Sequence, residues 1–171
     1  MCARHRSRQA IRVFAALILM GVMTLTGGGQ DSTTFGTKKA GMTMHAAGTF
    51  EVKLDRQTDP QADAQLSRMM IDKQFHGDLE GTSHGQMLAA GTDVKGSAGY
   101  VAIEKVTGKL GGKSGNFILQ HTATMTRGVP QLSITVVPDS GTGELVGLTG
   151  SMLITIADGK HSYAFDYSLT P

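Results

Sequence analysis

Hydrophobic and polar residues alternate with a period of two through most of the chain after residue 44. Leu132, Ile134 and Val136, for example, alternate with Ser133 and Thr135. This pattern is typical of a β-strand with one buried face, because successive side chains of a strand point to opposite faces of the sheet. No stretch of helical length shows the three- and four-residue spacing of an amphipathic helix. The pattern therefore predicts an all-β domain.

The alternating segments predict eight strands, and short glycine-containing turns separate several of them. The predicted strands span residues 44–54, 67–76, 79–90, 97–109, 114–126, 131–138, 147–157 and 161–169. The predicted turns are Gly77-Asp78, Gly111-Gly112, Arg127 to Pro130 and Asp158-Gly159. Connections this short make successive strands antiparallel neighbours. Because closure removes the unpaired edges of a meander, we expect a single eight-stranded antiparallel meander closed into a barrel.

The two-residue turns also predict which residues face one another across the strands. The Gly111-Gly112 turn predicts the pairs Val106–Phe117, Glu104–Leu119, Ala102–His121 and Tyr100–Ala123. The Asp158-Gly159 turn predicts the pairs Ile154–Tyr163, Met152–Phe165 and Gly150–Tyr167. These side chains share one face, which we predict to be the buried interior. By the same reasoning, the Gly77-Asp78 turn predicts that Glu80 faces Phe75 and points inward near the rim.

The charge is distributed unevenly along the chain. Residues 1–41 carry six Lys and Arg against one Asp, whereas residues 42–171 carry ten Lys and Arg against thirteen Asp and Glu. The predicted barrel therefore lacks the basic face that nucleic-acid binding requires, and we expect no nucleic-acid partner. Cys2 is the single cysteine of the sequence, so the predicted barrel can form no internal disulfide and no thiolate metal site.

The first 29 residues have the layout of an export signal. Basic residues from Arg4 to Arg12 precede a nearly unbroken apolar run from Val13 to Leu25, and small residues follow. We expect residues 1–29 to be an export segment, residues 30–43 a linker and residues 44–171 the barrel. The protein would then be periplasmic or secreted, and would contact a membrane only through this segment if it stays uncleaved. The alternative is a cytoplasmic protein whose translation starts at Met42 or Met44.

Glu104 and His121 are the residues with the clearest chemical potential. Both lie on the predicted interior face of adjacent strands, within reach of each other. A carboxylate without a partner is unfavourable in an apolar interior, so the pair is either a hydrogen-bonded structural unit or the polar end of a cavity. A Glu beside a His could also act in proton transfer. The catalytic candidates are therefore Glu104 and His121.

A larger set of interior positions could line a binding site. The predicted ligand-binding residues are Glu104, His121, Tyr100, Glu80, Phe117 and Met125. The methionines of the strands indicate either an adaptable pocket lining or ordinary core filling. The histidines show no close ligand pairing of the kind found in zinc sites, so we predict no metal site and no cofactor.

Five blocks of the sequence span residues 48–53, 72–81, 99–104, 115–121 and 138–145. In their order and spacing they resemble a bacterial family, the domain-of-unknown-function 3224 family. The resemblance implies an eight-stranded barrel of the allene oxide cyclase-like class, often found as a small homo-oligomer, and implies no established activity. Glu104 and His121 match positions in two of these blocks. A shared fold does not by itself carry function.

Three functions remain open from the sequence. The first is a binding module that holds one small apolar or amphipathic ligand inside the barrel. The second is an isomerase or cyclase that uses the interior Glu/His pair. The third is a non-catalytic structural or oligomerising domain with a filled interior.

Overall fold

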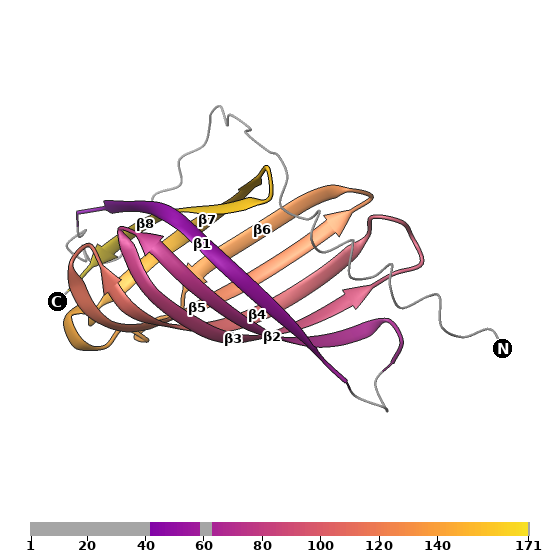
Figure 1. Ribbon diagram of the computed structural model, residues 1–171, viewed down its shortest axis with the longest axis horizontal. Helices are drawn as coiled ribbons and strands as arrows, with labels where there is room; N and C mark the ends of the chain where they lie inside the picture. The colour runs from indigo at the N-terminus through magenta and orange to yellow at the C-terminus, as the bar shows by residue number, and fades with distance from the viewer. Residues whose placement is uncertain (1–41, 59–62, 171) are drawn as a thin grey trace, which may run out of the picture.

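The computed structural model describes residues 42–58 and 63–170, which form a closed antiparallel barrel with its strands in chain order (Figure 1). The strands are β1 (Met44–Gln57), β2 (Leu66–Gly77), β3 (Leu79–Gly91), β4 (Ala98–Leu110), β5 (Lys113–Thr126), β6 (Val129–Val136), β7 (Leu148–Ala157) and β8 (Lys160–Leu169). A short 3-10 helix, η1 (Gly143–Leu145), lies between β6 and β7. The predicted eight-stranded barrel is confirmed. The predicted export segment and nearly all of the linker lie outside the described residues.

The register between β4 and β5 agrees with the prediction. Gly111 and Gly112 have φ angles of +56° and +82°, a conformation that glycine adopts without strain. Across this turn Ala102 lies opposite His121, and Glu104 lies opposite Leu119. The predicted pairs of β7 and β8 are confirmed as well. Short turns of fixed length therefore determine which side chains enter the interior.

The predicted register between β2 and β3 is wrong by one residue. Phe75 lies opposite Gly81, not opposite Glu80. Asp78 alone connects the two strands; its amide donates to the carbonyl of Ala47 at 3.1 Å, which holds it against β1. Because side chains alternate along a strand, the slip of one residue turns Glu80 to the exposed outer face.

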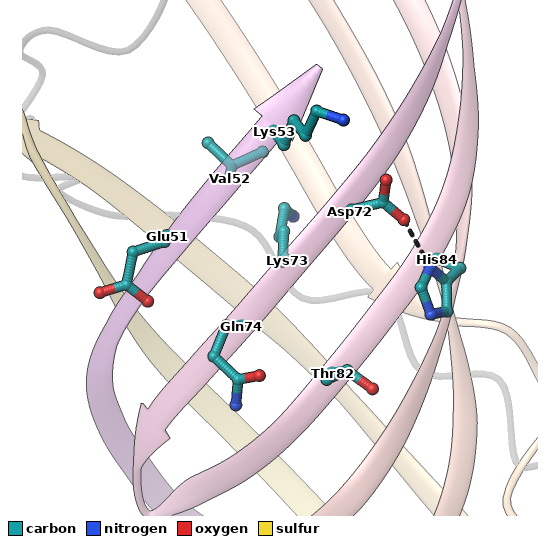
Figure 2. Close-up of a pocket in the computed structure, with 8 residues that line it drawn as sticks. All are labelled: Glu51, Val52, Lys53, Asp72, Lys73, Gln74, Thr82 and His84. Atoms are coloured by element: carbon teal, nitrogen blue, oxygen red, sulfur yellow. Dashed lines mark hydrogen bonds and ion pairs between the residues drawn. The ribbon is translucent and has the colours of Figure 1, made fainter. Parts of the chain in front are cut away.

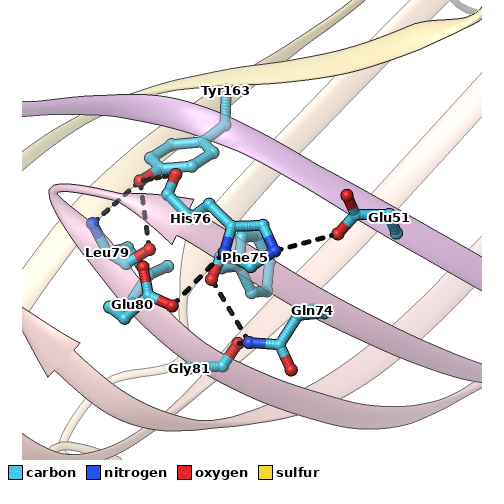
Figure 3. A network of polar contacts seen from close by, with 8 residues as sticks. All are labelled: Glu51, Gln74, Phe75, His76, Leu79, Glu80, Gly81 and Tyr163. Carbon is cyan, nitrogen blue, oxygen red and sulfur yellow. Dashed lines mark hydrogen bonds and ion pairs between the residues drawn. The ribbon is translucent and has the colours of Figure 1, made fainter.

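A tyrosine on β8 fastens the β2–β3 hairpin to the rest of the barrel (Figure 3). The hydroxyl of Tyr163 accepts a hydrogen bond from the amide of Leu79 at 2.8 Å and lies 3.3 Å from the carbonyl of His76. A Cβ atom at Gly48 would lie 2.6 Å from this hydroxyl and 2.0 Å from the same carbonyl. The close approach of β1 and β2 at this point therefore requires glycine at position 48.

The connection between β5 and β6 is shorter than predicted. Arg127 and Gly128 form the turn with positive φ angles of 49° and 90°, and β6 already begins at Val129. Pro130 therefore lies in a strand and not in the predicted turn. A proline is tolerated near the start of a strand or at an open edge. Among the described residues, β6 pairs with β7 at one position, Thr135 with Ser151. The edge of β6 beside Pro130 is therefore open on the side of β7.

The interior has a packed half and a hollow half. The packed half lies at the end that carries the β2–β3 and β4–β5 hairpins. Its fully buried side chains include Phe75, Leu79, Leu110, Phe117 and Phe165. Leu145 of η1 belongs to the same cluster. Close packing at this end seals the barrel, so a ligand could reach the interior from the opposite end.

Candidate functional site

The hollow half contains a cavity of about 520 Å³. Its apolar lining comes from Phe50, Val52, Leu54, Met69, Ile71, Met87, Ile154 and Ile156. Its polar lining comes from Arg56, Lys73, Tyr100, His121 and His161, and Gly159 completes the wall. A mostly apolar hollow of this size with a few convergent polar groups is the usual form of a small-molecule site. Among the described residues, the cavity lining contains no Asp or Glu.

Glu104 lies beneath the cavity and is fully buried. Its carboxylate accepts hydrogen bonds from Lys73 Nζ at 2.7 Å and from Ser83 Oγ at 2.6 Å. Burial by itself raises the pKa of this carboxyl, but the attraction of Lys73 and of His121 outweighs burial and lowers the pKa to about 2. Glu104 is therefore ionised and fully engaged at neutral pH, which makes it a weak proton acceptor.

Lys73 is the partner of Glu104 that the sequence analysis missed. It lies on the interior face of β2 between Ile71 and Phe75 and is 8% exposed. Its ammonium lies 5.0 Å from the ring centroid of Phe50 and 5.6 Å from that of Phe75, within the range of cation–π attraction. The alternation of β2 could have revealed this position, because the residues two before and two after it are large and apolar.

The inner face of β3 makes room for this buried pair. Ser83, which was also missed, is 1% exposed and donates to Glu104. Gly85 lies directly opposite Glu104, and a Cβ atom at this glycine would lie 3.1 Å from the Cβ of Glu104. The small side chains of β3 therefore allow a carboxylate and an ammonium to sit inside the barrel.

His121 connects the buried pair to the cavity. Its Nε2 lies 3.4 Å from Oε2 of Glu104, so the predicted proximity of these two residues is observed. Nε2 is buried and makes no hydrogen bond with any described residue. The ring also lines the cavity. The ring of His121 therefore borders the cavity, while its Nε2 edge faces the carboxylate of Glu104.

Tyr100 and His161 contribute neutral polar groups to the cavity lining. Burial, with a smaller contribution from Glu104, raises the pKa of Tyr100 to about 12. Burial and the nearby charge of Lys73 lower the pKa of His161, whose ring packs 5.0 Å from that of Phe50. At neutral pH both side chains can therefore donate or accept hydrogen bonds without carrying charge.

The remaining predicted site residues lie away from the cavity. Phe117 is 1% exposed in the packed half, where its ring stacks on Phe165 with centroids 5.8 Å apart. Met125 is buried in a small separate cluster with Ala123. Glu80 lies outside the barrel, 3.3 Å from Nδ1 of His76. Of the predicted set, Tyr100 and His121 line the cavity and Glu104 lies beneath it.

A second hollow lies on the outer face of β1, β2 and β3 (Figure 2). Its volume is about 360 Å³, and charged side chains of both signs surround it. Asp72 of β2 pairs with His84 of the neighbouring strand β3 at its side. Because exposed charges that pair with one another and with water bind a ligand weakly, the interior cavity is the better candidate site.

Residues 42–58 and 63–170 form neither a metal-binding cluster nor a membrane-spanning helix. No group of three or more His, Cys, Asp and Glu side chains gathers there in a way that could hold a metal ion. Within the same residues, no helix has the length and apolar character needed to cross a membrane.

The fold and the cavity define the class of this protein as a small closed β-barrel with a partly hollow interior. The family model of DUF3224, a family of proteins of unknown function, matches residues 46–167, and the chain belongs to this family. A crystal structure of a DUF3224 protein of unknown function from Shewanella oneidensis MR-1 is similar, with 47% sequence identity and a TM-score of 0.72. The match covers 76% of this chain and 100% of that one. No curated protein matches the chain.

Proposed function

We propose that the barrel binds one small, mainly apolar ligand in its interior cavity and acts as a binding module. The observation that carries this proposal is the cavity of about 520 Å³, whose lining is mostly apolar and includes the polar side chains of Lys73 and His121. An eight-stranded barrel has an interior just wide enough for packed side chains or for one small ligand. Here one half is packed and the other is not.

The contacts of Glu104 favour binding over proton transfer. A general base works best when its pKa lies near the operating pH. The pKa of Glu104 is held at about 2, and the Lys73 ammonium and the Ser83 hydroxyl occupy its oxygens. The carboxylate is therefore suited to hold Lys73 and His121 in place at the base of the cavity.

Native mass spectrometry of protein purified without detergent tests the proposal. We expect one adduct of a small molecule per barrel, which extraction into organic solvent removes. If the protein loses its ligand during purification, a panel of apolar and amphipathic compounds should raise its melting temperature, because a ligand that binds the folded state stabilises it. Absence of both an adduct and any thermal shift would contradict the proposal.

A further inference from the structure

We infer that the ligand is an anionic amphiphile, a molecule with one hydrocarbon chain or ring system and a single carboxylate-type group, and that Lys73 and His121 bind this group. The inference rests on the proposed function and specifies the chemistry of the ligand. It follows from the character of the cavity lining, from the hydrogen-bonding capacity of Lys73 and from the position of His121.

The polar lining formed by residues 42–58 and 63–170 can donate hydrogen bonds but offers no negative charge. Arg56 and Lys73 have donors and no acceptor, while Tyr100, His121 and His161 can each donate. Glu104, the nearest carboxylate, is 0% exposed and is covered by its own partners. A cationic group in this cavity would meet hydrogen-bond donors and positive charge, which disfavour it. An anionic group would supply acceptors for these donors.

Lys73 has hydrogen-bonding capacity to spare. An ammonium group has three N–H donors. Among the described residues, Nζ makes one hydrogen bond, to Oε2 of Glu104, and its other neighbours are the rings of Phe50 and Phe75. Since Lys73 lines the cavity, an oxygen atom of a bound ligand can supply the missing acceptor. Buried donors are normally satisfied, so this incomplete shell points to an acceptor from the ligand.

His121 can complete the recognition of the anionic group. Its Nε2 faces Glu104, 3.4 Å from the carboxylate oxygen that accepts from Lys73, and its ring borders the cavity. Both side chains therefore meet at one atom of Glu104, at the base of the cavity. The apolar walls formed by residues such as Ile71, Met87 and Ile154 would then enclose the hydrocarbon part of the ligand.

A comparison of three probes with the same chain tests this inference: decanoate, 1-decanol and decylamine. Each would be titrated against protein loaded with the neutral fluorescent dye N-phenyl-1-naphthylamine. We expect decanoate to displace the dye at concentrations at least 10-fold lower than 1-decanol, and decylamine to be the weakest competitor, because hydrogen bonds to charged groups are stronger than those between neutral groups. Equal affinities of decanoate and 1-decanol would overturn the inference and leave the proposed function intact. Failure of the dye itself to bind would count against both.

Two variants test which cation binds the carboxylate. The double variant Lys73→Met/Glu104→Gln removes both buried charges and keeps the site neutral, so it should remain folded. It should lose about 10-fold or more of its affinity for decanoate and keep its affinity for 1-decanol. The control Lys53→Met removes an exposed cation of β1 that is not part of the cavity lining and should change decanoate binding by less than about 3-fold. Undiminished decanoate affinity in the folded double variant would overturn the assignment of Lys73.

Discussion

The ammonium of Lys73 and the carboxylate of Glu104 form an ion pair of 2.7 Å between β2 and β4, and both side chains are buried in the barrel. The two strands are not neighbours, because β3 lies between them. The pair therefore spans the inner face of β3, where Ser83 supplies an additional hydrogen bond. It lies between the packed half of the interior and the cavity, which Lys73 also lines.

The effects of substituting Lys73 and Glu104 on the free energy of unfolding should depend strongly on each other. Lys73→Met leaves an uncompensated carboxylate in the interior, and we expect it to lower the free energy of unfolding by about 3 kcal/mol or more. Lys73→Met/Glu104→Gln should recover most of this loss, because neither charge remains. Urea denaturation of the two variants and the wild type measures the coupling.

An exposed ion pair on β1 provides the matched control. Lys53 and Asp55 also lie 2.7 Å apart, but their side chains are 71% and 47% exposed. Lys53→Met should change the free energy of unfolding far less than Lys73→Met, because water screens such a pair. Equal losses in Lys53→Met and Lys73→Met would show that burial of the Lys73–Glu104 pair has no energetic role.

The stability of the barrel should fall in acid because of Glu104. Despite burial, which raises the pKa, Lys73 and His121 lower it from 4.5 to about 2 in the folded protein. A carboxyl with a lowered pKa contributes stability above its unfolded value and loses that contribution as the pH falls toward the folded value. This group should account for about 3 kcal/mol of lost stability between pH 4.5 and 2.

The pH effect is measured by urea denaturation at several pH values across this window. The Lys73→Met/Glu104→Gln variant serves as the comparison, since it lacks the titrating group. We expect its stability to fall less steeply than that of the wild type. Parallel curves for the two proteins would refute an ionised and stabilised Glu104.

The fastening of the β2–β3 hairpin depends on the hydroxyl of Tyr163. Tyr163→Phe leaves the amide of Leu79 without its acceptor, and we expect a loss of about 1–2 kcal/mol in the free energy of unfolding. Tyr167→Phe is the matched control, because the hydroxyl of Tyr167 makes no hydrogen bond with other described residues and its removal should cost less than about 0.5 kcal/mol. Thermal denaturation compares the two; an equal effect would remove the special role of Tyr163.

The contact between β6 and β7 should be the weakest part of the barrel wall. Among the described residues, these two strands pair at one position, Thr135 with Ser151. By contrast, β4 and β5 pair along nearly their whole length, from Ala98–Met125 to Leu110–Lys113. Figure 1 shows the β7–β8 hairpin diverging from β6. We expect peptides from residues 129–133 to exchange amide hydrogens faster than peptides from residues 101–107. Equal protection in hydrogen exchange would indicate that the wall is uniformly closed.

Much of the architecture could be predicted from the sequence, because alternation and turn length leave little freedom. The Gly111-Gly112 turn has two residues, so simple counting places Glu104 and His121 correctly inside the barrel. The same counting failed at Gly77-Asp78, because the amide and carbonyl of Asp78 bond to neighbouring segments and the turn is one residue shorter. That slip moved Glu80 to the wrong face.

The site itself was only partly predictable. Lys73 falls on the interior face by alternation, yet lysine is rarely buried unless it is paired, so its role becomes visible once Glu104 is seen beside it. The division into a packed and a hollow half could not be predicted. Phe117 and Met125 alternate in the same way as His121, but only His121 borders the cavity. Local patterns give the face of a strand and do not give the volume left between side chains.

The central claim, that the interior cavity binds a ligand, is tested most directly by two tryptophan variants of adjacent residues. Ile154 lines the cavity, and Leu153 is 70% exposed on the outer face of the same strand. Titration with N-phenyl-1-naphthylamine should show one dye per barrel in the wild type and in Leu153→Trp. In Ile154→Trp, whose larger side chain fills the cavity, dye affinity should fall at least 10-fold while circular dichroism shows a folded barrel. Undiminished binding in a folded Ile154→Trp, or no binding in the wild type, would contradict the account.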